Sequence, residues 1–126
     1  MDVNARWMML YDELSDTLYV AFNPGEQATG IELNDYLLLR INKQERCAVG
    51  LTIFEYSVLT QLTELGPRSF PLSGLAQLST DLRELVLSIL QQPPVSDVLA
   101  VFAYTPASIT ESMPITAVKP LVMAHV

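Results

Sequence analysis

The sequence predicts an α+β fold: an antiparallel β-meander of four to five strands packed against one short and one longer helix, followed by a C-terminal strand or extended arm. Two observations predict it. The first half contains short runs of alternating apolar and polar residues separated by turn-forming residues, which is typical of antiparallel strands. The second half carries leucines at helical spacing and seven of the eight prolines, which limit any regular element there to a short length. With 126 residues, the chain is expected to form one domain, 1–126.

Five segments of the first half are predicted to be strands. An acidic turn at 12–16, an Asn-Pro-Gly turn at 23–25 and further polar turns separate them, because Asp, Asn, Pro and Gly favour turns over strand pairing. Short connections favour antiparallel neighbours, since parallel pairs need long crossovers. The predicted strands are 6–11, 17–22, 29–33, 36–41 and 47–54.

Helices are expected to cover one face of this sheet. Ser57 is a candidate N-cap of a short helix that carries Val58 and Leu59 and ends at Gly66-Pro67. The longer helix is predicted from an apolar stripe that steps by three and four residues and ends before Pro93-Pro94. The D-x-x-E pair formed by Asp81 and Glu84 offers a later start for this helix. The stripe consists of Leu75, Leu78, Leu82, Leu85 and Ile89, widened by Val86 and Leu90.

The C-terminal part, 67–126, permits more than one interpretation. The segment 98–104 is rich in valine and aromatic residues and is predicted to be a strand, with a short helix capped by Ser96 as the alternative. Three prolines interrupt 105–126. The segments 115–118 and 121–126 could each pair at a sheet edge or lie across a partner molecule.

Charge and cysteine content exclude several classes of function. The formal net charge is −7 and the pI is about 4.4, which opposes binding to nucleic acid because such binding needs lysine and arginine facing the phosphates. No uncharged apolar run reaches the roughly 18 residues of a membrane span. Cys47 is the only cysteine, so an internal disulfide is excluded, and with no recognisable leader the expected location is the cytoplasm.

The small share of charged residues favours self-association. Hydrophobic residues make up 50% of the chain and charged residues 17%, where about 25% is usual. A second copy covering apolar surface would account for this, so a homodimer is expected. The residues predicted to line the interface are the large aromatic Trp7 and the apolar C-terminal residues Leu121, Val122 and Met123.

The segment 7–57 resembles a small bacterial family known as domain of unknown function 2283. The resemblance lies in a Y-D-x-x-x-D-x-L-Y-V-x-F motif beginning at Tyr11, in Glu32 on the third predicted strand, and in a looser G-L-T-I-x-x-x-S motif beginning at Gly50. It implies a small antiparallel sheet with a helix and implies no activity. Thr52 replaces the glutamate usual in the second motif, and Arg40 and Asn42 stand where the family shows aspartates.

The acidic turn provides the candidate metal ligands Asp12, Glu13 and Asp16. Carboxylate oxygens bind Mg²⁺ and Ca²⁺, but calcium loops use about six oxygens and a glycine at the bend, whereas this turn has three carboxylates and no glycine. Turn formation by aspartates bonding to the backbone is therefore favoured over metal binding. No cofactor is expected, because the chain has no nucleotide-binding glycine motif and too few cysteines and histidines for zinc.

Three hypotheses for the function follow. The first is a non-enzymatic protein-interaction or structural module that self-associates. The second is a small metal-dependent hydrolase that uses Asp12, Asp16 and Glu32 as ligands or as acid and base. The third is an acidic regulatory partner of a basic protein, since the segment 1–66 alone holds ten acidic and four basic residues.

Overall fold

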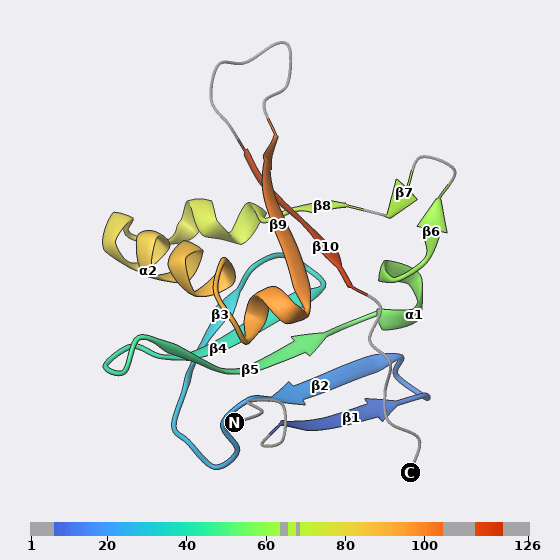
Figure 1. The fold of residues 1–126 in the computed structure, drawn as a ribbon, viewed down its shortest axis with the longest axis horizontal. Coiled ribbons are helices and arrows are strands. Elements are labelled where there is room, and N and C mark those ends of the chain that lie inside the picture. The colour runs from blue at the N-terminus through green and yellow to red at the C-terminus, as the bar shows by residue number, and fades with distance from the viewer. Residues whose placement is uncertain (1–6, 64–65, 68, 105–112, 120–126) are drawn as a thin grey trace.

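The computed structural model describes residues 7–63, 66–67, 69–104 and 113–119, and its main element is a five-stranded antiparallel sheet (Figure 1). The order of its strands is β1-β2-β5-β4-β3. All five predicted strands are confirmed within two residues at each end. They are β1 (Met8–Asp12), β2 (Thr17–Ala21), β3 (Thr29–Glu32), β4 (Leu37–Asn42) and β5 (Cys47–Ile53).

The strand order departs from a simple meander at one point. Strands β3, β4 and β5 pair with their neighbours in sequence, but β2 pairs with β5 and not with β3. Leu18 lies opposite Ile53 and Val20 lies opposite Leu51, so this pairing joins four buried apolar side chains on one face. Short connections correctly predicted antiparallel neighbours, but they do not decide which strand a hairpin pairs with next. The chain after β2 therefore runs to the far edge of the sheet, where β3 lies.

One face of the sheet builds the core. Residues two positions apart on β2, β3 and β4 and directly after them are buried, as the period of two requires, and they join a single cluster with residues of the helices and of the second sheet. Central strand β5 is buried along nearly its whole length. The members that are almost wholly buried include Leu18, Leu33, Leu39, Ile41, Leu51, Ile53, Val86, Leu90, Val95 and Leu99.

The short helix α1 (Tyr56–Leu59) follows β5 directly. Its N-cap is Glu55 and not Ser57, which lies inside the helix, so the predicted cap was wrong by two residues. The helix also ends earlier than expected, because the next residues form a two-stranded hairpin of β6 (Leu62–Thr63) and β7 (Gly66–Pro67).

The leucine stripe is divided between two helical elements. Leu75 belongs to a 3₁₀ helix, η2 (Ser73–Gln77), and the remainder of the stripe reaches into α2 (Thr80–Leu90). Ser79 is the N-cap of α2 and accepts a hydrogen bond from the Leu82 amide at 3.3 Å, so the helix begins after Leu75 but two residues before the start at Asp81 that the D-x-x-E pair offered.

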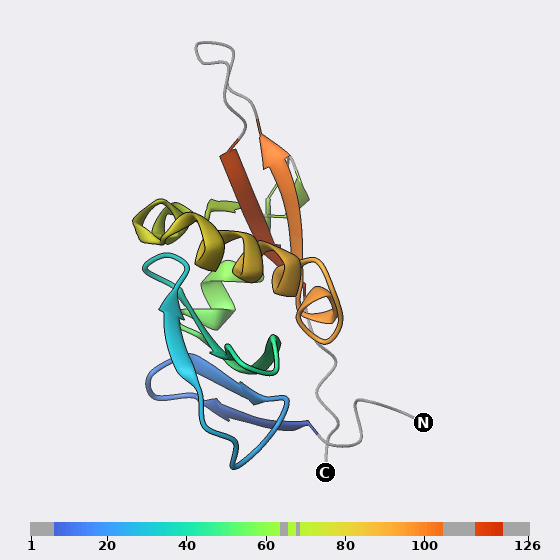
Figure 2. The ribbon, with the colours of Figure 1, turned by 90° about the vertical axis from the view of Figure 1, so that its left-hand side faces the viewer.

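A second, three-stranded sheet completes the fold. Its order is β8 (Phe70–Pro71), β10 (Met113–Val118) and β9 (Leu99–Tyr104), with the 3₁₀ helix η3 (Val95–Asp97) before β9. The strand interpretation of 98–104 is thus confirmed. Figures 1 and 2 show the β9–β10 hairpin extending away from the five-stranded sheet with α2 lying beside it. The segments 105–112 and 120–126 lie outside the described residues.

The joint between the two sheets depends on Gly74. Its amide donates to the Leu33 carbonyl at 2.8 Å, and a Cβ atom added there would lie 1.9 Å from the Glu32 carbonyl oxygen. We expect Gly74→Ala to lower the free energy of unfolding by about 1–3 kcal/mol, because backbone must shift to admit the methyl group. Urea unfolding would measure it.

Gly30→Ala is the matched control, since its added Cβ would meet only the end of the Leu38 side chain at 3.5 Å. If the two substitutions lower the free energy of unfolding equally, the close contact of Gly74 with Glu32 does not contribute specifically to stability.

Candidate functional site

The acidic turn between β1 and β2 is held by Asp16. This residue has a left-handed backbone with φ of 52°, and its carboxylate accepts hydrogen bonds from the Tyr11 hydroxyl at 2.5 Å, the Ser57 hydroxyl at 2.6 Å and the Ser57 amide at 3.0 Å. The Asp16 carbonyl also accepts from the Tyr56 amide at 2.9 Å. Asp16 therefore ties the first hairpin to the start of α1.

These contacts shift two pKa values in opposite directions. The hydrogen bonds from Ser57 and then Tyr11 hold the pKa of the Asp16 carboxyl below its usual value. The hydrogen bond to Asp16, with partial desolvation and the nearby negative charge, raises the pKa of Tyr11 to about 12. Asp16 is thus stabilised as an acceptor and Tyr11 as a donor, which is what a structural link requires.

Asp12, the other aspartate of the turn, forms hydrogen bonds within the turn and none with Asp16. The Asp12 carboxylate accepts from the Leu14 amide at 3.1 Å and the Ser15 hydroxyl at 2.9 Å. Among the described residues, no group of three or more acidic, histidine or cysteine side chains is placed to hold a metal ion. The structure thus gives Asp12 and Asp16 the turn-forming role, while metal binding at Asp12, Glu13 and Asp16 stays an untested prediction.

The acids named for the hydrolase hypothesis are not brought together. Asp16 directly precedes β2 and Glu32 lies on β3, and strands β5 and β4 lie between β2 and β3. Three strand spacings separate β2 from β3, or roughly 14 Å. Proton transfer needs a reach of one hydrogen bond or one bridging water, so Asp16 and Glu32 do not form an acid–base pair.

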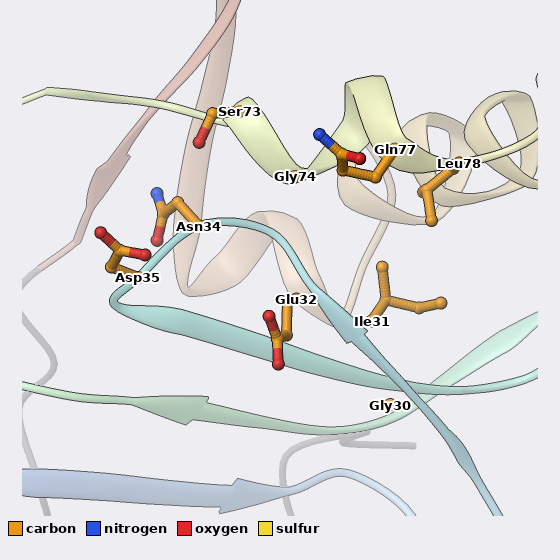
Figure 3. A pocket seen from close by; sticks show the side chains of 9 residues that line it. All are labelled: Gly30, Ile31, Glu32, Asn34, Asp35, Ser73, Gly74, Gln77 and Leu78. Carbon is orange, nitrogen blue, oxygen red and sulfur yellow. The ribbon is translucent and has the colours of Figure 1, made fainter.

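A shallow depression of about 360 Å³ lies between β3 and η2 (Figure 3). Strand β3 and the turn after it form one side, and η2 with Leu78 forms the other. Asn34 fixes the turn, since its amide donates to the Pro71 carbonyl at 3.1 Å and its side-chain oxygen accepts from the Tyr36 amide at 2.8 Å. The depression is lined by Gly30, Ile31, Glu32, Asn34, Asp35, Ser73, Gly74, Gln77 and Leu78.

The face of the sheet opposite the core carries a half-buried arginine. Arg40 lies between Gly50 on β5 and Gly30 on β3, and a Cβ at Gly50 would lie 2.3 Å from an Arg40 Nη atom. The absence of that side chain lets the guanidinium lie across the strand. Arg40 Nε is buried without a hydrogen-bond partner among the described residues, which is a costly state for a polar donor.

In the part of the chain that the structure describes, no strand pairs with the outer edge of β1, and this edge is apolar. Met8 and Leu10 are 62% and 66% exposed, and their side chains lie on the same face as Tyr19 and Ala21 of β2. Natural proteins usually protect such an edge with lysine, proline, a bulge or a covering segment. Met8–Asp12 contains neither lysine nor proline, and its pairing with β2 is regular.

Of the predicted interface residues, only Trp7 lies in the described part of the chain. Its ring packs against Phe22 with centroids 4.8 Å apart, so it contributes to the margin of the core. Leu121, Val122 and Met123 lie outside the described residues. Cys47 is a free thiol, and partial burial followed by the charges of Glu26 and Glu45 raises its pKa, which disfavours the reactive thiolate.

Two features of the surface were not predicted from the sequence. The depression joins Glu32 to Ser73, and no local pattern indicates that these segments meet. The apolar edge could have been found, because Met8-Met9-Leu10 lacks the alternation of a strand with one wet face. That signal predicts a strand with apolar residues on both faces.

We expect Asp16→Asn to lower the melting temperature by several degrees at neutral pH, because one amide oxygen cannot accept all the bonds that the carboxylate accepts. Since the folded-state pKa of Asp16 lies below its unfolded value, this stabilisation is complete above about pH 4 and is lost as the pH falls through the folded-state pKa. Thermal unfolding of both proteins between neutral and acidic pH measures the difference. Glu13→Gln, which removes the same charge from the same turn, should leave the melting temperature nearly unchanged, and an equal effect would contradict the role of Asp16.

We expect Arg40→Met to raise the free energy of unfolding by about 1 kcal/mol, because it removes a buried unpaired donor and keeps much of the volume. Arg83→Met should have the opposite sign, since Arg83 donates to the Leu75 and Leu78 carbonyls at 2.9 and 3.1 Å. Chemical denaturation distinguishes the two variants. If Arg40→Met lowers the free energy of unfolding, Arg40 Nε has a hydrogen-bond partner in solution and the expectation is wrong.

Comparison with known proteins gives no assignment: no family model, curated protein or solved structure matches the chain. The resemblance to domain of unknown function 2283 therefore stays a prediction. In the described part of the chain, no helix is long and apolar enough to cross a membrane.

Proposed function

We propose that the protein is a non-enzymatic protein-interaction module that self-associates through the edge strand β1. The observation that carries the proposal is the exposure of Met8 and Leu10 on a sheet edge that pairs with no other strand among the described residues. Exposed apolar edge strands are templates for pairing with another chain. The cytoplasm is the proposed setting, which suits a protein with one free, weakly acidic thiol at Cys47.

The backbone of β1 has groups free for such pairing. The Phe22 amide donates to Val49 on β5, so by alternation Val20 and Leu18 also direct their backbone groups toward β5. Their partners on β1, Met9 and Tyr11, therefore direct their amides and carbonyls away from the sheet. A second strand can bond to these groups.

Two copies of β1 fit each other by symmetry. An antiparallel pair centred on Leu10 places Met9 of each copy opposite Tyr11 of the other, where both residues have free backbone groups. Leu10 then lies opposite its own copy, at the closer spacing of a pair without direct hydrogen bonds. An isologous contact of this kind closes as a dimer and buries the exposed apolar side chains.

The enzymatic alternative has less support. Its acids Asp16 and Glu32 are separated by strands β5 and β4, and Asp16 already accepts hydrogen bonds from Tyr11 and Ser57. The hypothesis of an acidic partner for a basic protein does not compete with self-association, because it concerns a different surface.

We expect Leu10→Lys to convert a dimer into a monomer, raising the dissociation constant at least about tenfold, because a charge at the edge opposes strand pairing. Light scattering coupled to size exclusion measures the mass. Leu14→Lys is the control, because Leu14 is 100% exposed in the turn and outside the proposed contact. A wild-type protein that stays monomeric at about 100 µM would refute the proposal.

The register has its own test. Leu10→Cys should form a disulfide between two copies under mild oxidation, since opposed residues of an antiparallel pair meet the distance that a disulfide needs. Leu14→Cys should crosslink far less, and equal crosslinking by both would contradict pairing centred on Leu10.

A further inference from the structure

We propose that the opposite edge of the sheet, strand β3 with its adjoining depression, binds an extended segment of another protein that carries lysine or arginine. The segment would add to the sheet as a further strand. This inference rests on the proposal that the protein acts by protein–protein contact, but not on the pairing of β1.

No described strand pairs with the outer edge of β3, which has backbone groups available for strand addition. The Leu33 amide donates to the Leu37 carbonyl at 2.9 Å, so Leu33 and, by alternation, Ile31 direct their backbone groups toward β4. Gly30 therefore directs its amide and carbonyl toward the open edge, and the Glu32 amide points the same way, while the Glu32 carbonyl lies against Gly74 of η2. Gly30 is exposed and has no side chain, so another backbone can approach closely at that point.

The depression gives the added strand a place for a side chain. Its volume of about 360 Å³ falls in the range of ligand sites, roughly 300–1,000 Å³. Gly74, bonded to the Leu33 carbonyl, fixes η2 at the end of β3, so the depression has a firm far wall. Ser73 and Gln77 on that wall add polar groups.

The charge of this edge selects the occupant. Glu32 and Asp35 are both exposed beside the depression, and none of the residues that line it is basic. A chain of net charge −7 adds to the same negative field. A lysine or arginine side chain would complement it.

Neither edge of a second copy supplies that charge. The segment Met8–Asp12 contains one acid and no basic residue, and a second β3 would place Glu32 and Asp35 against their own copies. Like charges facing each other across an interface are unfavourable. The two edges are thus chemically distinct, and the occupant of β3 is a different protein.

The test uses the full chain and a labelled probe peptide. Fluorescence anisotropy would follow a fluorescein-labelled decapeptide of alternating threonine and lysine, with the threonine–glutamate peptide as the control. We expect saturable binding of the lysine peptide that weakens as salt is added, and no binding of the glutamate peptide.

Variants locate the site. Glu32→Gln combined with Asp35→Asn should weaken binding at least about tenfold, through loss of two charges at the contact. The matched control is Asp81→Asn with Glu84→Gln, which removes two exposed charges from α2 and should have little effect. Gly30→Pro, which removes an amide from the free edge only, should also weaken binding while leaving the folded circular dichroism spectrum intact.

Three outcomes would overturn the inference: no saturable binding up to about 1 mM, equal weakening by both double variants, or full binding by Gly30→Pro. The mass of each variant, measured in parallel, separates this site from the self-association site. The β3 variants should keep the wild-type mass, and Leu10→Lys should keep peptide binding. If the peptide does not bind, the proposal for β3 is refuted and self-association through β1 is unaffected. If the protein is monomeric, self-association is refuted and the proposal for β3 is unaffected.

Discussion

The pairing of β2 with β5 is the constraint on which the rest of the fold depends. It is the only strand contact between the N-terminal hairpin and the other three strands of the large sheet. It also joins Leu18 and Val20 to Leu51 and Ile53, all completely buried. The Asp16 link reinforces the same junction, because it connects the end of the hairpin to the residues directly after β5. Asp12 and Asp16, which were candidate metal ligands, thus form hydrogen bonds that stabilise the turn and its contact with α1.

The two edges of the sheet differ in polarity and in what packs against them. Strand β1 lies far from η2 in the strand order, and its exposed Met8 and Leu10 make an apolar margin. Strand β3 packs against η2 through Gly74 and ends in an acidic turn, which makes a polar margin. Under the two proposals, in which β1 pairs with a second copy and β3 binds a basic segment, the protein would bring that partner into an assembly of defined symmetry.

Local patterns predicted most elements and the pairing of most consecutive strands in the large sheet, but not the contacts between distant segments. The alternation in 17–22 and the leucine spacing from Leu75 to Ile89 reflect periods of two and 3.6, which are properties of a segment by itself. The pairing of β2 with β5 and the approach of Gly74 to Glu32 join residues 29 or more positions apart, and neither leaves a local signal. The same limit applies to the candidate sites. The acidic turn was visible as a cluster, whereas the depression exists only because η2 folds back onto β3.

The order of the strands has a consequence for the protein during synthesis. Leu18 packs beside Ile53, which the ribosome adds 35 positions later. The first hairpin therefore emerges before the strand that pairs with it has been made. An isolated hairpin is marginally stable in water, and this one exposes its apolar edge as well. The nascent chain is therefore most vulnerable to premature association before β5 has left the exit tunnel.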